Sequence, residues 1–387
     1  MLDFTGVPVI DNHCHPIDPA KATLPPEALA REFYHGIGDQ PEPGVGARRW
    51  GASQELRHHW PDMGVVQTMV CQLSQLLGCA PELDAVADER NRRTAESFPR
   101  YARLLYQDAG IAATVLDCGN AKGDPVLDLI PGRHLRLFQM SPAVHRFLKE
   151  SGSYHEMLLS YQESLDRAVR VDGFIGVKSH LAEEVSFGAQ PISDAEAAAA
   201  FAAAQTGDGE AYKKLYVAIF ITTMLQCREL GVPVHVHAGI TGGLWEGPIA
   251  NADPFLLVPL IRRPEFVQTR LVLLHGAYPW IQHAAAVAHA LPHVWVDMGW
   301  TTPWISLRIA DCYRDLIGMA PLSKLVIGSG GHGTPEIAWL AAKTAKIALG
   351  ETLGDAVRLG LMTEVQAKRA GRMILHDNAA RLYSLEQ

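Results

Sequence analysis

Eight short apolar runs recur along the chain, and most of them are separated by stretches with the spacing of amphipathic helices. Continuous apolar runs are typical of parallel strands, because both faces of such strands are buried. Eight β/α units in a chain of 387 residues predict an α/β fold, the (β/α)8 TIM barrel. A doubly wound open sheet is the rival, but no dinucleotide-binding glycine pattern follows the first strand. The predicted strands are Val7–Ile10, Ile111–Leu116, His134–Phe138, Gly173–Lys178, Pro233–His237, Leu271–His275, Val294–Asp297 and Leu325–Ser329.

The whole chain, residues 1–387, is predicted to form one barrel domain. After Pro16 the strand pattern stops and helical spacing replaces it, so residues 17–108 are expected to form a mainly helical insertion after the first strand. Two further stretches, Val144–Arg170 and Thr363–Tyr383, each have the pattern of one long helix. A chain of this length can bury a sizeable core.

Composition limits the partners of the chain. Its formal charge is −8 and its pI about 6.1, and no basic run is interleaved with aromatic residues, so nucleic acid is not an expected partner. The longest strongly apolar run, Val217–Leu225, is about half a membrane span, and no signal-peptide pattern opens the sequence, so no membrane association is expected. Six scattered cysteines without a C-x-x-C pair favour reduced thiols and a cytoplasmic location. The expected partner is a small-molecule substrate, and a homo-oligomer stays open because barrels of this size often form one.

His13 and His15 stand at the end of the first predicted strand, in the stretch VPVIDNHCHP. Residues two apart on an extended chain point to the same face, so the two imidazoles are expected to form a pair. Neutral imidazoles side by side are suited to hold a divalent metal ion. An isolated H-x-H is more often a core histidine beside a loop histidine, so the interpretation depends on what the other strands carry.

Further residues of metal-binding type follow the later strands. Lys178 ends the fourth strand, His237 the fifth, His275 the sixth and Asp297 the seventh. Active sites of TIM barrels lie at the C-terminal ends of the strands, so these groups are expected at one level of the barrel. Together with the histidine pair they predict a metal site. His235 shares the face of His237 and is expected deeper in the barrel, as a hydrogen-bond partner of a ligand.

Five motifs occur in this order: DNHCHP, GVKSH, HVHAG, LLHGAYPW and IGSGGHGTPE. Together they resemble the amidohydrolase superfamily. Within it the chain is similar to the amidohydrolase-related (amidohydrolase 2) branch, which is sometimes fused or linked to glutamine synthetase-like proteins. The similarity covers nearly the whole chain, including the helical insertion. The motifs are specific for the superfamily and not for a substrate.

The resemblance implies a set of metal ligands. His13 and His15 match the strand 1 ligands of the deeper metal ion, and His237 and His275 match the ligands of strands 5 and 6. Lys178 matches the lysine that, in binuclear members, is carbamylated and bridges two metal ions. The metal is commonly zinc, which lowers the pKa of a bound water and polarises the scissile carbonyl. The implied reaction is hydrolysis of an amide, a lactone or a related C–N bond, with one metal ion or two.

One position departs from the family pattern. The family carries an aspartate after strand 8, in a G-S-D segment, which ligates the metal and transfers the proton. Here Gly330 stands at that place, and the loss of a general base typically costs a factor of about 100 to 10,000 in rate. Three explanations stay open: an inactivated variant, a natural paralogue that no longer hydrolyses, or another group that replaces the acid.

Several titratable residues are candidates for that replacement: His332, Glu336, Asp297 and His180. His332 is favoured because it lies two residues past the gap on a glycine-rich loop, and a histidine can act as base and then as acid. It could equally contact the substrate or only pack on the loop. Glu336 stands at a helix start, where a carboxylate is favoured for other reasons. The residues expected to be catalytic are His332, His275 and Lys178.

Aromatic residues follow the sixth and seventh strands. Tyr278, Trp280, Trp300 and Trp304 either line an apolar or aromatic substrate pocket or pack between loops and helices. Arg136 on the third strand either binds a substrate carboxylate through two hydrogen bonds or is a surface charge.

The sequence therefore favours a metal-dependent hydrolase that acts on an amide or related C–N bond of a small molecule, with an activity impaired or altered at Gly330. A first alternative is a lyase of the same superfamily, such as a decarboxylase with one metal ion and an unmodified Lys178. A second is a catalytically silent protein that binds a metal or a small molecule.

Overall fold

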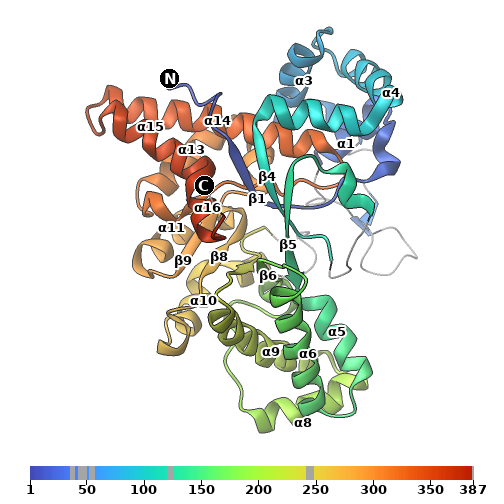
Figure 1. Ribbon diagram of the computed structural model, residues 1–387, viewed down its shortest axis with the longest axis vertical. Coiled ribbons are helices and arrows are strands. Elements are labelled where there is room, and N and C mark those ends of the chain that lie inside the picture. The colour runs from blue at the N-terminus through green and yellow to red at the C-terminus, as the bar shows by residue number, and fades with distance from the viewer. Residues whose placement is uncertain (35–39, 42–49, 52–56, 120–124, 241–247, 386–387) are drawn as a thin grey trace.

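The computed structural model describes residues 1–34, 40–41, 50–51, 57–119, 125–240 and 248–385. Within these residues, eight parallel strands follow one another around a barrel in the order of the sequence, which confirms the TIM-barrel prediction (Figure 1). The strands are β1 (Val9–Cys14), β4 (Ile111–Leu116), β5 (Arg133–Gln139), β6 (Gly176–Ser179), β7 (Val234–Val236), β8 (Leu271–Leu273), β9 (Val294–Asp297) and β10 (Leu325–Val326).

The last strand is joined to the first by backbone hydrogen bonds just beyond β10. Asn12 N donates to Ile327 O at 2.8 Å, and Gly330 N donates to His13 O at 2.7 Å. The chain after β10 therefore runs directly beside the C-terminal half of β1, and the wall of the barrel is continuous.

Helices surround the barrel, with α3 and α4 grouped on one side and α5, α6, α8 and α9 on another (Figure 1). The described α-helices are α1 (Pro26–Glu32), α3 (Gly64–Leu77), α4 (Leu83–Ala109), α5 (Met140–Glu150), α6 (Tyr154–Arg170), α7 (Leu181–Glu184), α8 (Asp194–Gln205), α9 (Gly209–Leu230), α10 (Pro254–Ile261), α11 (Ile281–Ala290), α12 (Thr301–Trp304), α13 (Ile309–Ile317), α14 (Pro335–Arg358), α15 (Glu364–Arg372) and α16 (Asn378–Leu382). None of the helices in the described part of the chain is long and apolar enough to cross a membrane.

The interior of the barrel is filled by alternate residues of the strands. Val115, Leu137 and Trp295 point inward and pack in one cluster, whereas Val296 packs in the layer between the barrel and the helices. Tyr383, just after α16, belongs to the inner cluster. The C-terminal segment therefore closes the end of the barrel at which the strands begin, and the candidate site lies at the other end.

Two predicted long helices are divided in the structure, so those predictions were wrong in extent. Val144–Arg170 contains the end of α5 and all of α6, because the side chain of Ser153 caps a new helix by accepting a hydrogen bond from Glu156 N. Thr363–Tyr383 contains α15, a π-helical turn (Met373–Asp377) and α16. Apolar spacing continues across these breaks because both helices of each pair face the same core.

The described residues between β1 and β4 are mainly helical. They form a 3-10 turn, η1 (Pro19–Ala22), then α1, α3 and α4, with a small antiparallel pair, β2 (Gln40–Pro41) and β3 (Trp50–Gly51). The remaining residues of the predicted insertion 17–108, namely 35–39, 42–49 and 52–56, lie outside the described residues.

A buried ion pair connects these helices to the helix after β10. Arg90 of α4 and Glu336 of α14 both have fully buried side chains, and Arg90 Nε lies 2.6 Å from Glu336 Oε1. The guanidinium of Arg90 also donates hydrogen bonds to the backbone oxygens of Lys21 and Ala22. Arg90 thus connects three segments: its own helix α4, the start of α14, and the backbone at Lys21 and Ala22.

We expect Arg90→Met to lower the free energy of unfolding by about 3–5 kcal/mol, because the carboxylate of Glu336 would stay buried without its partner. Urea denaturation measures the loss. Arg92→Met is the matched control, since Arg92 lies on the same helix but pairs with Glu89 and Glu96 at the surface, and it should lower the free energy of unfolding far less. Equal losses from the two substitutions would contradict the role of the buried pair.

Candidate functional site

His13 and His15 lie at the C-terminal end of β1, a strand in which every residue is buried. Their ring centroids are 5.1 Å apart and the rings stand at 78° to each other. The side chain of His13 is only 1% exposed, and His15 Nδ1 lies 3.1 Å from Asp117 O. The end of β1 therefore brings both imidazoles into one region, next to Asp117, which directly follows β4.

His13, His15 and Asp117 form a first group of possible metal ligands. One ligand atom from each residue lies within 4.8 Å of the other two. The Nδ1 atom of His13 is buried and has no hydrogen-bond partner, which is costly for a polar atom unless something else occupies it. Two imidazoles and a carboxylate are ligands typical of zinc sites, so these residues fit a divalent metal ion.

His180, Glu183 and His237 form a second group with the same spacing of ligand atoms. The rings of His180 and His237 are 5.8 Å apart, and Glu183 Oε1 lies 3.8 Å from His237 Nε2. His180 directly follows β6 and immediately precedes the four-residue helix α7, which carries Glu183. Sequence reasoning missed Glu183. A helix of one turn is too short to show a repeating apolar spacing, so the helix that carries Glu183 could not be predicted.

Lys178 lies between the two groups. Its Nζ atom is 3.6 Å from Asp117 Oδ2 and 2.8 Å from His180 Nε2, and its side chain is 1% exposed. Asp117 also accepts a hydrogen bond from Gln139 on β5. Sequence reasoning missed Asp117 as a possible ligand, although its position directly after β4 is a signal that could have marked it.

His275 lies near both groups but belongs to neither three-residue set. Its ring centroid is 4.4 Å from that of His237 and 5.4 Å from that of His13. It follows β8 in a tight turn with a φ of 64°, in the left-handed region that side chains rarely adopt. The hydroxyl of Thr301 donates to His275 O and helps to hold this conformation.

A polar layer lies beneath the histidines, inside the barrel. The Tyr383 hydroxyl contacts His235 Nε2 at 2.7 Å and also donates to Asn12 Oδ1. Asn12 Nδ2 in turn donates to Asp297 Oδ2 at 2.9 Å. His235 therefore contacts Tyr383, and Asp297 is held by Asn12 in the same layer.

Electrostatics keep the imidazoles of the site neutral. Burial, reinforced by the charge of Lys178, lowers the pKa of His180 and of His237 to about 3, and burial lowers that of His15 to about 4. Burial alone would raise the pKa of Asp117, but the ammonium of Lys178 holds it at about 2. Neutral imidazoles and ionised carboxylates are the forms that bind metal ions.

The loop after β10 is shaped around a glycine. Gly330 has a φ of 61°, and a Cβ at this position would lie 2.7 Å from Trp300 N and 2.8 Å from Trp300 Cα. Beyond it, His332 stacks on Trp304 with ring centroids 5.9 Å apart and stands 6.3 Å from the ring of His15. Burial lowers the pKa of His332.

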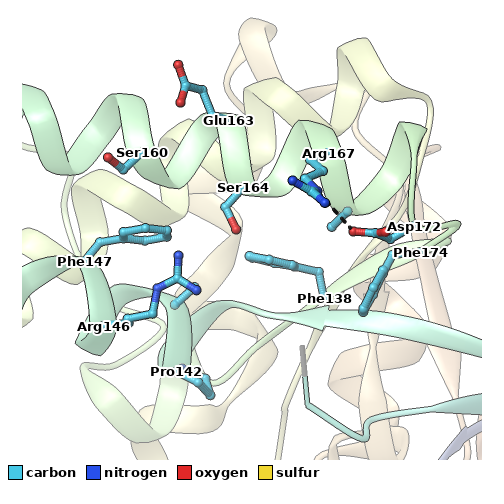
Figure 2. A pocket seen from close by; sticks show the side chains of 12 residues that line it. Phe138, Pro142, Arg146, Phe147, Ser160, Glu163, Ser164, Arg167, Asp172 and Phe174 are labelled. Atoms are coloured by element: carbon cyan, nitrogen blue, oxygen red, sulfur yellow. Dashed lines mark ion pairs between the residues drawn. The ribbon is translucent and has the colours of Figure 1, made fainter. Parts of the chain in front are cut away.

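Two other candidates lie away from this cluster. Glu336 is fully buried against Arg90 in the ion pair described above. Arg136 lies over the ring of Phe174 at 4.0 Å. Phe174 and Phe138 line a cavity of about 580 Å³ between α5 and α6, shown in Figure 2, which contains none of the possible metal ligands. Arg136 is therefore directed toward the helical layer rather than toward the site.

Comparison with known proteins identifies the family to which the chain is similar. Residues 160–385, more than half of the chain, match the model of the amidohydrolase family. The protein fluG of Emericella nidulans is 31% identical over 156 residues, which are 40% of this chain. The aligned region spans only 18% of the length of fluG.

Solved structures show the same fold. A protein of Lactobacillus casei, provisionally described as a metal-dependent hydrolase, has a TM-score of 0.82 and 18% identity, with 99% of this chain and 98% of that chain covered. The glucuronate isomerase of Caulobacter crescentus has a TM-score of 0.69 and 15% identity, with 99% and 92% covered. A uronate isomerase of Bacillus halodurans has a TM-score of 0.67 and 14% identity, with 99% and 94% covered.

The contacts at position 330 generate a prediction about stability. Gly330→Ala should lower the free energy of unfolding by more than Gly360→Ala does, as measured by urea denaturation. Gly360 has a similar φ of 70°, but no atom lies within 4 Å of the place that a Cβ would take there, so this control isolates the backbone cost of about 1 kcal/mol. Gly330→Asp should be at least as destabilising. Equal losses at 330 and 360 would show that the backbone of Trp300 yields easily.

Proposed function

The chain belongs to the amidohydrolase family, and on that premise we propose that it is a hydrolase that uses a divalent metal ion to cleave an amide or related C–N bond of a small molecule. The observation that supports this most is the convergence of two ligand groups on Lys178 at the mouth of the barrel. Four strands, β1, β4, β6 and β7, bring side chains to this arrangement at the same end of the barrel.

Zinc is the metal that the ligand chemistry favours, since imidazole nitrogens with a carboxylate are its common ligands. His13, His15 and Asp117 would hold one ion, and His180, Glu183 and His237 are arranged for a second. An ion bound there would supply a Lewis acid that activates water and polarises a carbonyl group. His275, beside both groups, is proposed as a further ligand or a contact to the reacting carbonyl.

Lys178 is proposed to carry a carbamate when the site is loaded. Its neutral amine would add to carbon dioxide, forming an N–C bond and releasing one proton to solvent. An ammonium between two cation sites repels both ions, whereas a carbamate reverses the charge and offers two oxygens as ligands. The distances of 3.6 Å to Asp117 and 2.8 Å to His180 support this role, because the amine reaches both groups.

His332 is proposed as the group that moves the proton in place of the aspartate missing at position 330. It lies on the loop after β10, two residues beyond position 330, and its ring centroid is 6.3 Å from that of His15. Asp297 is less suited, because its carboxylate is turned to Asn12 and to the backbone N–H of Gly299.

A cytoplasmic location is proposed as well. The six cysteines, all in the described residues, carry free thiols, which is typical of proteins in a reducing compartment.

Removal of metal tests the first part of this proposal. Dialysis against a chelator should abolish hydrolysis of a panel of small amides, and zinc should restore it. His13→Ala should lower the metal content measured by elemental analysis, while His283→Ala should leave it unchanged, because His283 pairs with Asp253 on the outside of the barrel. Unchanged metal content in His13→Ala would contradict the metal site. Release of carbon dioxide from an aromatic acid, without amide hydrolysis, would favour the decarboxylase alternative.

Substitution of His332 tests the proton transfer. His332→Phe keeps a ring stacked on Trp304 but removes both basic nitrogens, so kcat should fall by about 100- to 10,000-fold while metal content stays the same. His59→Phe is the control, since His59 is exposed. Unchanged turnover in His332→Phe would show that another residue carries the proton.

A further inference from the structure

A second feature of the barrel mouth is a cavity of about 540 Å³ beside the histidines. The loops after β8 and β9 contribute Tyr278, Trp300 and Trp304, while Tyr34 and Val65 come from the helical segment between β1 and β4. Its wall is therefore largely aromatic and aliphatic, and it is assembled from the same two loops that hold His275 and approach position 330.

A stack of parallel rings connects this cavity to the first ligand group. Trp300 and Trp304 stack with centroids 5.5 Å apart and an angle of 11° between their planes. Trp304 and His332 continue the stack at 5.9 Å and 10°. His332 then stands edge-on to His15, with centroids 6.3 Å apart. The flat faces of the stack thus have one orientation from the cavity to the possible metal ligands.

A second connection runs to the other ligand group. Ile240 lines the cavity, and its carbonyl oxygen lies 2.9 Å from His237 Nε2. The backbone N–H of Ile240 donates to Tyr278 O at 2.7 Å, which fixes one wall of the cavity to another. A molecule in the cavity would therefore be separated from His237 by Ile240, and from His15 by Trp304 and His332.

The chemistry of the wall selects among ligands. Of the described residues that line the cavity, Arg308 alone is charged, and its Nε atom lies 3.4 Å from Asp311 Oδ2. A sugar acid would leave most of its hydroxyl groups without partners against such a wall, which is costly for buried polar groups. A planar ring instead gains area burial and edge-to-face contact with the indoles, since Trp300 and His332 cover the faces of Trp304.

From this geometry we propose that the cavity is the substrate-binding subsite for a flat aromatic group, so that the preferred substrates are aromatic carboxamides. This inference rests on the proposed hydrolase function for the position of the scissile bond. It adds the chemical class of the substrate, and it assigns Trp304 and Trp300 as specificity-determining residues.

Equilibrium binding tests this inference without turnover. The probes are 2-naphthamide and decahydronaphthalene-2-carboxamide, which share the carboxamide and the two-ring skeleton but differ in planarity. Calorimetric titration of the full chain, dialysed against a chelator so that 2-naphthamide is not hydrolysed, should give a Kd for 2-naphthamide that is about fivefold lower than for the saturated probe, because aromatic contact with the indoles favours the planar ring.

Variants locate the selectivity. Trp304→Leu should abolish the preference for 2-naphthamide, whereas Trp304→Phe should retain most of it. This pair also controls for folding, since both variants lose the hydrogen bond from Trp304 Nε1 to Phe33 O. Phe255→Leu removes an exposed aromatic side chain of α10 that does not line the cavity, and it should leave both Kd values unchanged.

Several results would overturn the inference: equal affinity for the two probes, equal behaviour of Trp304→Leu and Trp304→Phe, or tighter binding of glucuronate than of 2-naphthamide. The test also separates this inference from the proposed function. Selective binding of 2-naphthamide by a chain that hydrolyses no amide would keep the aromatic subsite and refute the hydrolase. Hydrolysis of short aliphatic amides, together with equal affinity for the two probes, would support the hydrolase and refute the aromatic subsite.

Discussion

Closure of the barrel between β10 and β1 is the interaction on which the candidate site depends. The backbone N–H of Gly330 donates to His13 O, and Ser329 donates from both its N–H and its hydroxyl to the carboxylate of Asp11. Asp11 is fully buried, and burial raises its pKa to about 6, although the hydrogen bonds from Ser329 favour its charged form. This seam places His332 beside the histidine pair, and it also leaves no space for a side chain at position 330.

The floor of the site and the core of the barrel share the same residues. Tyr383 comes from the far end of the chain, packs with Trp295 and Val115 inside the barrel, and presents its hydroxyl to His235 and Asn12. Buried polar groups of this kind are stable only when they are paired with one another. The C-terminal segment therefore stabilises the fold and orients the polar layer beneath the possible metal ligands through one side chain.

The helices between β1 and β4 have a comparable double role. Through Arg90 they hold the start of α14, which directly follows the loop that carries His332. Through Tyr34 and Val65 they complete the wall of the aromatic cavity. A barrel alone would present the possible metal ligands to open solvent, whereas this segment adds a largely apolar wall on one side of them.

The sequence by itself determined which residues end the strands, because continuous apolar runs and the helical spacing between them are local patterns. His13, His15, Lys178, His237 and His275 could thus be expected at one end of a barrel from the order of the residues alone. Only the tertiary structure decided how these residues group, and it added two carboxylates, Asp117 and Glu183, to them. It also divided the long helices and brought Tyr383 into the core. The physical reason is that these contacts join segments far apart in the sequence through loops and caps, whose conformations depend on the packing of the whole barrel rather than on any local period.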